Sequence, residues 1–258
     1  MFVLTGPFTC FLQDKNKLYL LTELVQGGEF FNYIANRGVL RDEEARFYTG
    51  NTLLALEHMH NNNIIYRDLK PENIVMATNG YLKLVDLGFA KQMDSGQTYT
   101  VCGTPDYIAP EIIASKGHNK AVDYWSLGVL IYEQLTGLTP YYDPQGNVFQ
   151  IYEKIMKEQL RYPPEAQLSA EAKSLIGALL TVNPARRIGS FKGGAIDIKA
   201  HPWFQDFDFK QLEARTMEVP YKPPATSPEE MIKSYEEEPE EVFHDICTWD
   251  PDFEIKRR

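Results

Sequence analysis

The segment IIYRDLKPENIV, residues 64–75, gathers chemically active side chains between two short apolar runs. It carries Arg67, Asp68, Lys70 and Asn73, which combine a carboxylate, an amide and two cations. Carboxylate and amide oxygens are donors suited to a hard metal cation, and cations neutralise anionic groups. Taken singly, each residue is better interpreted as a turn residue that satisfies nearby backbone groups. An active site here therefore requires that other segments supply the rest of it.

The part of the chain before this segment predicts a hairpin and a long helix. Residues 2–24 read as two apolar strands around a polar turn at residues 13–16. Asp42 is a plausible N-cap for the helix, because two glutamates follow it in the positively polarised first turn. Apolar residues at helical spacing continue this helix to His60.

The part of the chain after the segment predicts a second hairpin arm and several helices. NGYLKLVDLG, residues 79–88, reads as a strand that follows the turn Asn79-Gly80. Residues 123–137 are apolar almost all round and end at Gly137, as a buried central helix would. Two amphipathic helices complete the set, at residues 147–160 and at residues 169–180 after the N-cap Ser169.

Periodicity fades toward the C-terminus. Proline and glutamate become frequent from about Pro220, so we expect the compact domain to end between Trp203 and Phe209. Residues 229–258 carry 11 acidic and 4 basic residues, and thus most of the net charge of −10. The simplest interpretation of this run is a solvated, loosely ordered tail. The nearly neutral body argues against nucleic-acid binding by the fold.

The composition is that of an ordinary soluble globular protein. Hydrophobic residues make up 43% of the chain and charged residues 24%. The three cysteines lie far apart in the sequence, which favours a reducing cytoplasmic compartment over a disulfide scaffold. The longest apolar run, near residues 127–132, is too short to cross a bilayer.

The order of several motifs resembles the C-lobe of the eukaryotic protein kinases. These motifs are YRDLKPEN, DLG, GTPDYIAPE, DYWSLGVLIYE and NPARRIG, and the match runs from residue 1 to about 209. The resemblance implies an α+β fold that is mostly the helical C-lobe. It divides the chain into a residual N-lobe hairpin and hinge at 1–24, the C-lobe at 25–209, and an acidic C-terminal tail at 210–258.

The resemblance assigns catalytic roles to the opening segment and its partners. Asp68 matches the aspartate that accepts or orients the proton of the substrate hydroxyl, and Lys70 the lysine that neutralises the transferring phosphate. Asn73 and Asp86 match the two ligands of Mg²⁺, which would accompany ATP. Thr104 resembles the threonine that contacts the catalytic aspartate. Asp86 stands in DLG where DFG is usual, and we expect Leu87 to keep the apolar anchor.

Other matching residues imply regulation and structure. Arg67 matches the arginine that holds a phosphorylated activation-loop residue, for which Thr100 is the candidate, although an unmodified exposed threonine is the alternative. Glu111 of APE is expected to pair with Arg187, and Asp123 to tie the catalytic loop to the central helix.

Further motifs narrow the resemblance to the AGC group, in particular its cyclic-nucleotide-dependent branch. The tyrosine of YRD, GFAK and TVCGTPDYIAPE carry this likeness. Glu29, Glu72 and Glu133 fall where this branch recognises arginines upstream of the phosphoacceptor, although each could equally be solvated surface charge. The nucleotide pocket is expected to use the following residues: Thr22 as gatekeeper, Glu23 and Val25 at the hinge, Glu29, Val75 and Asp86.

The end of the chain resembles the tail of the AGC kinases. PYKPPATSP and SYEEEPEE carry that likeness, and CTWDPDF is similar to the end of a cyclic-GMP-dependent kinase. Tyr235 fits the tail tyrosine of the family. Ile232, however, stands where the family has a nucleotide-contacting phenylalanine.

The sequence lacks the glycine-rich loop and the strand lysine of a kinase N-lobe. Loss of one preorganised donor costs about 3–4 kcal/mol in the transition state, so we expect slow or no turnover by this polypeptide alone. Two hypotheses follow. In the first, a longer parent with the N-lobe or a regulatory domain is an active serine/threonine kinase acting on basic peptides. In the second, the chain is a pseudokinase-like module that binds such peptides.

Overall fold

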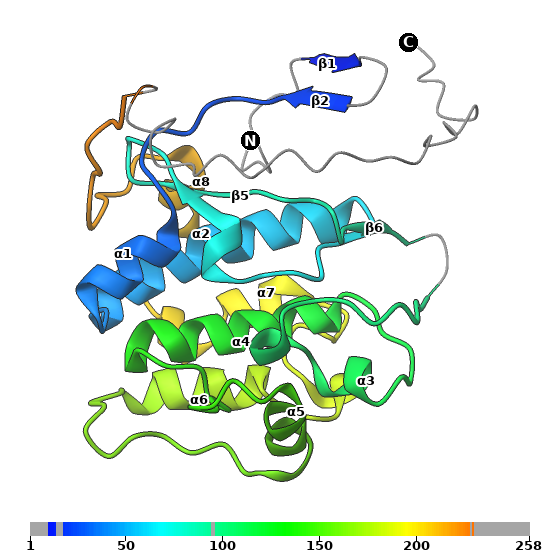
Figure 1. The fold of residues 1–258 in the computed structure, drawn as a ribbon. Coiled ribbons are helices and arrows are strands. Elements are labelled where there is room, and N and C mark those ends of the chain that lie inside the picture. Colours follow the sequence, from blue (N-terminus) through cyan, green and yellow to red (C-terminus); the bar gives the residue numbers. More distant parts are fainter. Residues whose placement is uncertain (1–9, 14–17, 94–95, 228, 230–258) are drawn as a thin grey trace.

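The computed structural model describes residues 10–13, 18–93, 96–227 and 229, and shows a mostly helical body with small antiparallel sheets (Figure 1). Its α-helices are α1 Phe30–Arg37, α2 Asp42–Asn61, α3 Pro110–Ile113, α4 Ala121–Thr136, α5 Val148–Lys157, α6 Ala170–Leu179, α7 Ala195–Lys199 and α8 Phe209–Ala214. The strands are β1 Cys10–Gln13, β2 Leu18–Leu21, β3 Ile64–Ile65, β4 Ile74–Met76, β5 Leu82–Leu84 and β6 Lys91–Gln92. Single 3-10 turns are η1 Pro71–Asn73, η2 Pro105–Tyr107, η3 Pro184–Arg186 and η4 Pro202–Phe204.

The core of the body lies between α2, α4 and α6, which form successive layers in Figure 1. The sequence prediction of a central buried helix is confirmed, since Trp125, Leu127 and Leu130 on α4 are fully buried. This helix ends at Gly137, whose φ of 81° is the left-handed conformation that favours glycine, and whose N–H bonds the Glu133 carbonyl. No helix in the described ranges is long and apolar enough to span a membrane.

The start of α2 differs from the sequence prediction. Arg41, not Asp42, is the N-cap, because Glu44 reaches back to accept the Arg41 backbone N–H at 3.1 Å. Asp42 lies inside the helix and is used for tertiary contacts instead. Its Oδ1 accepts from Trp203 Nε1 at 3.0 Å, and its Oδ2 from Arg46 Nη2 at 2.7 Å. The carboxylate therefore ties α2 to the C-terminal part of the body.

The two predicted hairpins are confirmed. β1 pairs antiparallel with β2, with Cys10 opposite Leu21. β4 pairs antiparallel with β5, with Ile74 opposite Leu84. The second turn needs glycine at position 80, where φ is 86° and a Cβ would lie 2.4 Å from the Tyr221 carbonyl oxygen.

The packed structure continues beyond the expected end of the compact domain near residues 203–209. Leu212 of α8 is fully buried, and Pro223 further along is also buried. Hydrogen bonds fix the intervening segment, since Tyr81 Oη donates to the Met217 carbonyl at 3.1 Å. Sequence periodicity missed the part after α8 because residues 215–227 form neither helix nor strand. Most of the acidic tail, including Ile232, Tyr235 and CTWDPDF, lies outside the described residues.

Candidate active site

The carboxylate of Asp68 is the centre of the candidate site. Asp68 is buried, and its Oδ2 accepts from Asn73 Nδ2 at 2.7 Å, while its Oδ1 accepts from Thr104 Oγ1 at 3.0 Å. Lys70 Nζ lies 3.5 Å from Oδ2. Asn73 comes from η1 and Thr104 from the residue before η2, so two separate segments orient one carboxylate. The structure thus brings together the four residues assigned to catalysis from the sequence.

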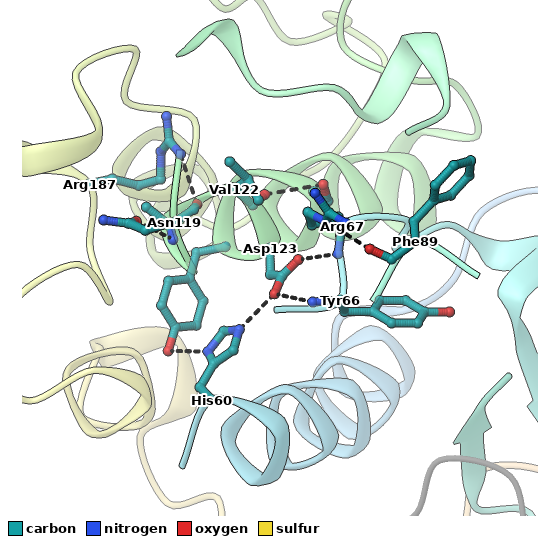
Figure 2. Close-up of polar contacts among 11 residues, drawn as sticks. His60, Tyr66, Arg67, Phe89, Asn119, Val122, Asp123 and Arg187 are labelled. Atoms are coloured by element: carbon teal, nitrogen blue, oxygen red, sulfur yellow. Dashed lines mark hydrogen bonds and ion pairs between the residues drawn. The ribbon is translucent and has the colours of Figure 1, made fainter. Parts of the chain in front are cut away.

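The backbone before Asp68 is held by Asp123 on α4, as Figure 2 shows. Asp123 is fully buried; its Oδ1 accepts from the Arg67 N–H at 2.8 Å and its Oδ2 from the Tyr66 N–H at 3.0 Å. Arg67 has a φ of 69°, a left-handed conformation that costs about 1–3 kcal/mol outside glycine. Asp123 therefore stabilises a strained bend that presents Asp68.

Sequence reasoning missed a histidine that completes this arrangement. His60 Nε2 lies 2.7 Å from Asp123 Oδ2, and His60 Nδ1 lies 3.1 Å from the hydroxyl of Tyr124 (Figure 2). Burial raises the pKa of the Tyr124 hydroxyl above its ordinary range, so the hydroxyl keeps its proton. The last turn of α2 is thereby joined to the start of α4. No local pattern in the sequence links these residues.

Asp86 follows β5 at a second bend. Its φ is 56°, and its Oδ1 accepts from the Gly88 N–H at 2.8 Å. Tyr66 Oη donates to the carbonyl of the preceding Val85 at 2.5 Å, so the two bends are connected. The expectation that Leu87 forms a buried anchor is wrong for the described structure. Its side chain is 42% exposed, because no described element covers it.

The donor set at this bend fits a magnesium ion. The Nδ2 group of Asn73 donates to Asp68, so Oδ1 of Asn73 is available as an acceptor. The side chain of Asp86 is exposed. Among the described residues there is no group of three or more His, Cys, Asp or Glu that could hold a metal by themselves. Mg²⁺ is usually bound through one or two carboxylates together with waters and substrate phosphates, and Asp86 and Asn73 offer oxygen donors of this kind.

The predicted partners Glu111 and Arg187 form a buried bidentate ion pair. Arg187 Nη1 and Nη2 lie 2.8 and 2.9 Å from the two carboxylate oxygens. The guanidinium is fully buried and also donates to the carbonyls of Thr181 and Ala121. It lies 5.1 Å from the centre of the Trp125 ring. The ion pair joins α3 to the segment after η3, and the bond to the Ala121 carbonyl joins that segment to the start of α4.

The arginine expected to hold an activation-loop phosphate has a donor nitrogen without a partner in the described ranges. Arg67 Nε donates to the Phe89 carbonyl at 2.7 Å (Figure 2), while Nη1 is buried and has no hydrogen-bond partner among the described residues. Nearby, Lys91 Nζ donates to Thr98 Oγ1 at 2.9 Å. Thr100 itself is exposed. Arg67 can therefore accept an additional anionic partner without losing its existing bond.

Of the three predicted substrate-binding glutamates, Glu133 has the most specialised surroundings. It accepts a short hydrogen bond from the hydroxyl of Tyr107 on η2. Burial raises the pKa of Glu133 to about 7, and the negative charges of Glu72 and Asp106 add to the shift. Glu29 and Glu72 are exposed. No sequence pattern predicts the contact with Tyr107, although Tyr107 lies within GTPDYIAPE.

The residues assigned to the adenine pocket are spread around the hinge. Glu23 is ion-paired with Lys83 of β5 at 2.6 Å. Val25 and Val75 are half-buried, whereas Thr22 is exposed. Backbone bridging between Glu29 and Val75 brings the hinge to the edge of β4. Residues close to the predicted hinge are thus joined to the sheet of β4 and β5, which Asn73 precedes and Asp86 follows.

Comparison with known proteins identifies the protein family to which the chain belongs. The sequence signature of the protein kinase domain matches residues 7–204. The chain therefore belongs to the protein kinase domain family, which confirms the resemblance drawn from YRDLKPEN and its companion motifs.

Curated relatives place the chain near the cAMP-dependent kinases of the AGC group. It is 41% identical over 232 residues to cAMP-dependent protein kinase type 3 of Saccharomyces cerevisiae. It is 46% identical over 211 residues to the cAMP-dependent protein kinase catalytic subunit of Dictyostelium discoideum. It is 45% identical over 210 residues to the human cAMP-dependent protein kinase catalytic subunit PRKX. The matches cover 90%, 82% and 81% of this chain, but only 57%, 32% and 57% of those proteins.

Proposed function

We propose that the protein containing this chain is an ATP-dependent serine/threonine kinase of the cyclic-nucleotide-dependent type. The observation that carries the proposal is the orientation of Asp68 by Asn73, Thr104 and Lys70 within one cluster. Phosphoryl transfer requires mainly that the acceptor hydroxyl be positioned and the phosphate charge be neutralised, and this cluster offers groups for both tasks.

Each residue has a defined part in the proposed reaction. Asp68 accepts a hydrogen bond from the substrate hydroxyl and takes its proton, while Thr104 and Asn73 keep the carboxylate in orientation. Lys70, whose Nζ lies 3.5 Å from Asp68 Oδ2, would neutralise charge on the transferring phosphate. Asn73 and Asp86 would hold Mg²⁺, which neutralises the phosphate oxygens of ATP when bound. Glu23, Val25, Glu29 and Val75 would line the nucleotide pocket.

The proposed substrates are proteins with arginines upstream of serine or threonine. Glu29, Glu72 and Glu133 supply the negative charge for such a preference. Relatives named as cAMP-dependent support the cyclic-nucleotide branch, whereas cGMP dependence rests on CTWDPDF alone. Nη1 of Arg67, which has no partner in the part of the chain that the structure describes, supports phosphorylation of Thr100. We also propose a cytoplasmic location, on the cysteine usage given above.

A second candidate function is peptide binding without turnover. The observation that favours it is the group of acidic side chains around Tyr107, in which Glu133 lies close to Glu72 and Asp106. Under this alternative the module holds basic peptides as a scaffold.

The test is phosphate transfer from Mg-ATP to an arginine-rich serine peptide, followed by mass spectrometry. Turnover that is abolished by Asp68→Asn would support the kinase function for this chain. Binding of the peptide without any nucleotide-dependent thermal shift would favour the scaffold. The same assay on the protein of native length shows whether a lack of turnover is specific to this chain or is due to the residues of the site.

A further inference from the structure

Two buried side-chain nitrogens near the segment of Thr100 lack a hydrogen-bond partner within the described ranges. They are Nη1 of Arg67 and Nε2 of His118, which lie far apart in the sequence. Buried polar atoms are almost always hydrogen-bonded, so each of these two nitrogens needs an explanation. The proposed function uses Arg67 but gives no task to His118.

The backbone of His118 is paired with that of Thr98, two residues before Thr100. The N–H of each residue donates to the carbonyl of the other, at 2.9 and 2.8 Å, which forms an isolated antiparallel bridge. Residues directly opposite each other in an antiparallel pair direct their side chains to the same face. Thr98 and His118 are both buried. The imidazole of His118 therefore lies beside the side chain of Thr98.

Lys91 and Arg67 bring two cations to this face. Lys91 Nζ donates to Thr98 Oγ1 at 2.9 Å, so the ammonium lies beside the residue that opposes His118. The positive charge of Arg67 also reaches His118, since it is one of the causes that lower the pKa of the imidazole. Thr98 Oγ1, which accepts from Lys91, still has its own proton to donate. Donors from four side chains thus gather around the bridge.

The acidic groups near His118 already have other partners. Glu111 is in its buried ion pair, and Asp123 holds the bend that presents the catalytic carboxylate. The nearby thiol of Cys102 is uncharged, because burial raises its pKa. Burial, followed by the charges of the two cations, lowers the pKa of His118, although Glu111 and Asp123 oppose this. The imidazole of the unmodified chain is therefore neutral near pH 7.

Phosphorylation of Thr100 would supply an acceptor for these donors. Side chains alternate along an extended chain, so Thr100 falls on the same side as Thr98. Residues 98–101 contain no helix, and Thr100 is exposed, so its hydroxyl is accessible to another kinase molecule. The hydroxyl oxygen bonds to the γ-phosphorus of ATP as the bond to the bridging oxygen breaks, ADP leaves, and the proton passes to the base of the second kinase. The phosphate brings a charge of about −1.5 to −2 and three acceptor oxygens.

We propose that His118 binds the phosphate of Thr100 beside Arg67, and that protonation of His118 tightens this binding as the pH falls from about 8 to 6.5. The inference rests on the proposed phosphorylation of Thr100. A phosphate beside the imidazole favours its protonated form, in which both ring nitrogens donate. The bond from Nε2 is then charge-assisted and stronger than a neutral one. In this role His118 is a positioning residue, which holds the segment around Thr100 and takes no part in phosphate transfer.

The first test compares two preparations of the wild-type chain. The whole chain is prepared with threonine or phosphothreonine at position 100, and NMR follows the ring of His118 as the pH is changed. We expect the phosphate to raise the proton affinity of His118 at least about tenfold, because a dianion beside an imidazole favours its charged form. His118→Gln serves only to assign the signal. An equal proton affinity in the two preparations would contradict the proposal.

The second test measures how well the phosphate is protected from a nonspecific phosphatase. The rate for a free phosphopeptide of residues 97–104 is divided by the rate for the chain at each pH, which cancels the pH dependence of the phosphatase. From pH 8 to about 6.5, above the value near 6 at which the phosphate itself titrates, we expect this protection to rise about three- to tenfold. His118→Gln should remove the rise, and His58→Gln, on an exposed residue of α2, should retain it.

The outcomes separate this inference from the proposed function. If the phosphate is protected equally in the wild type and in His118→Gln at every pH, His118 has no role, and the phosphorylation of Thr100 stands. If the wild type and both variants lose the phosphate as fast as the free peptide does, the phosphate is not bound, and the roles of Arg67 and His118 both fail. Neither result bears on catalysis by Asp68, which phosphate transfer to a peptide tests.

Discussion

The carboxylate of Asp123 lies 2.8 Å from the backbone nitrogen of Arg67, a residue whose φ of 69° is unfavourable without support. Three donors converge on this one side chain, from Tyr66, Arg67 and His60. The bend that presents Asp68 is thus supported by α4 and α2 together. Without that support, the left-handed residue would be free to relax and Asp68 would lose its orientation.

We therefore expect Asp123→Asn to destabilise the chain and to displace Asp68. The amide offers one acceptor where two are needed, and each buried donor left unsatisfied costs about 1–3 kcal/mol. Urea unfolding measures the loss. Asp208→Asn is the control, because asparagine is an equally good N-cap for the short helix α8. Equal stability of the two variants would contradict the role given to Asp123.

The pair Glu111–Arg187 gives a second stability prediction. Arg187→Ala leaves a carboxylate buried without its partner, which typically costs about 3–5 kcal/mol. Arg187→Lys should be intermediate, since it keeps the charge but not the bidentate geometry. Lys157→Ala, which breaks the exposed pair with Glu153, should have little effect in the same thermal unfolding assay. A small loss for Arg187→Ala would show that the pair is not needed for folding.

Much of this fold follows from local patterns in the sequence. Ser169 and Gly137 delimit their helices as predicted, because caps act on adjacent backbone groups. Asp68, Lys70 and Asn73 could be grouped because they share one short segment, and Thr104 could be added to them from the known order of motifs.

Other features depend on contacts between distant segments. Asp42 was expected to cap a helix, but the side chain of Trp203 competes for it. The bonds between Gln26 and Thr226 join positions 200 residues apart, and the contacts of His60 with Asp123 and Tyr124 are of the same kind. Hydrophobic periodicity holds no information on such pairings.

The burial of Glu133 predicts a pH-dependent affinity for basic peptides. The pKa of Glu133 is raised to about 7, so the carboxylate becomes fully negative only above that pH. The affinity for an arginine-containing peptide should therefore rise as pH increases from about 6 to 8. Glu133→Gln should bind more weakly and show a flatter profile. Parallel profiles for the two proteins would contradict the assignment.

The raised pKa of Glu133 also affects stability, which should fall as pH rises, whereas the peptide affinity should increase. Because the folded pKa exceeds the unfolded value of 4.5, the folded chain binds more protons between pH 4.5 and about 7. The contribution of Glu133 to the free energy of unfolding thus decreases as pH rises through this window. Glu133→Gln removes that slope, which denaturant titrations at several pH values can measure.

His118 predicts that stability depends on pH in the opposite direction. It is buried under the segment that contains Thr98, and burial, with the nearby cation Arg67 and more weakly Lys91, lowers its pKa, against the opposing charges of Glu111 and Asp123. The unfolded chain then binds more protons below the ordinary value of 6.5, so stability falls as pH decreases through that value. His118→Gln should flatten this dependence in urea titrations. An unchanged slope in the variant would exclude His118 as its source.

The central claim is that Asn73 and Asp86 hold a metal ion beside Asp68 when nucleotide binds. Titration of Mn²⁺ and ATP into the chain, followed by electron paramagnetic resonance, tests this directly, because Mn²⁺ prefers the same oxygen ligands. We predict a metal–nucleotide complex whose affinity falls at least about tenfold in both Asp86→Asn and Asn73→Ala, and is unchanged in Gln205→Lys. Equal Mn²⁺–ATP binding by the wild type and all three variants, or no binding by any of them, would contradict the claim.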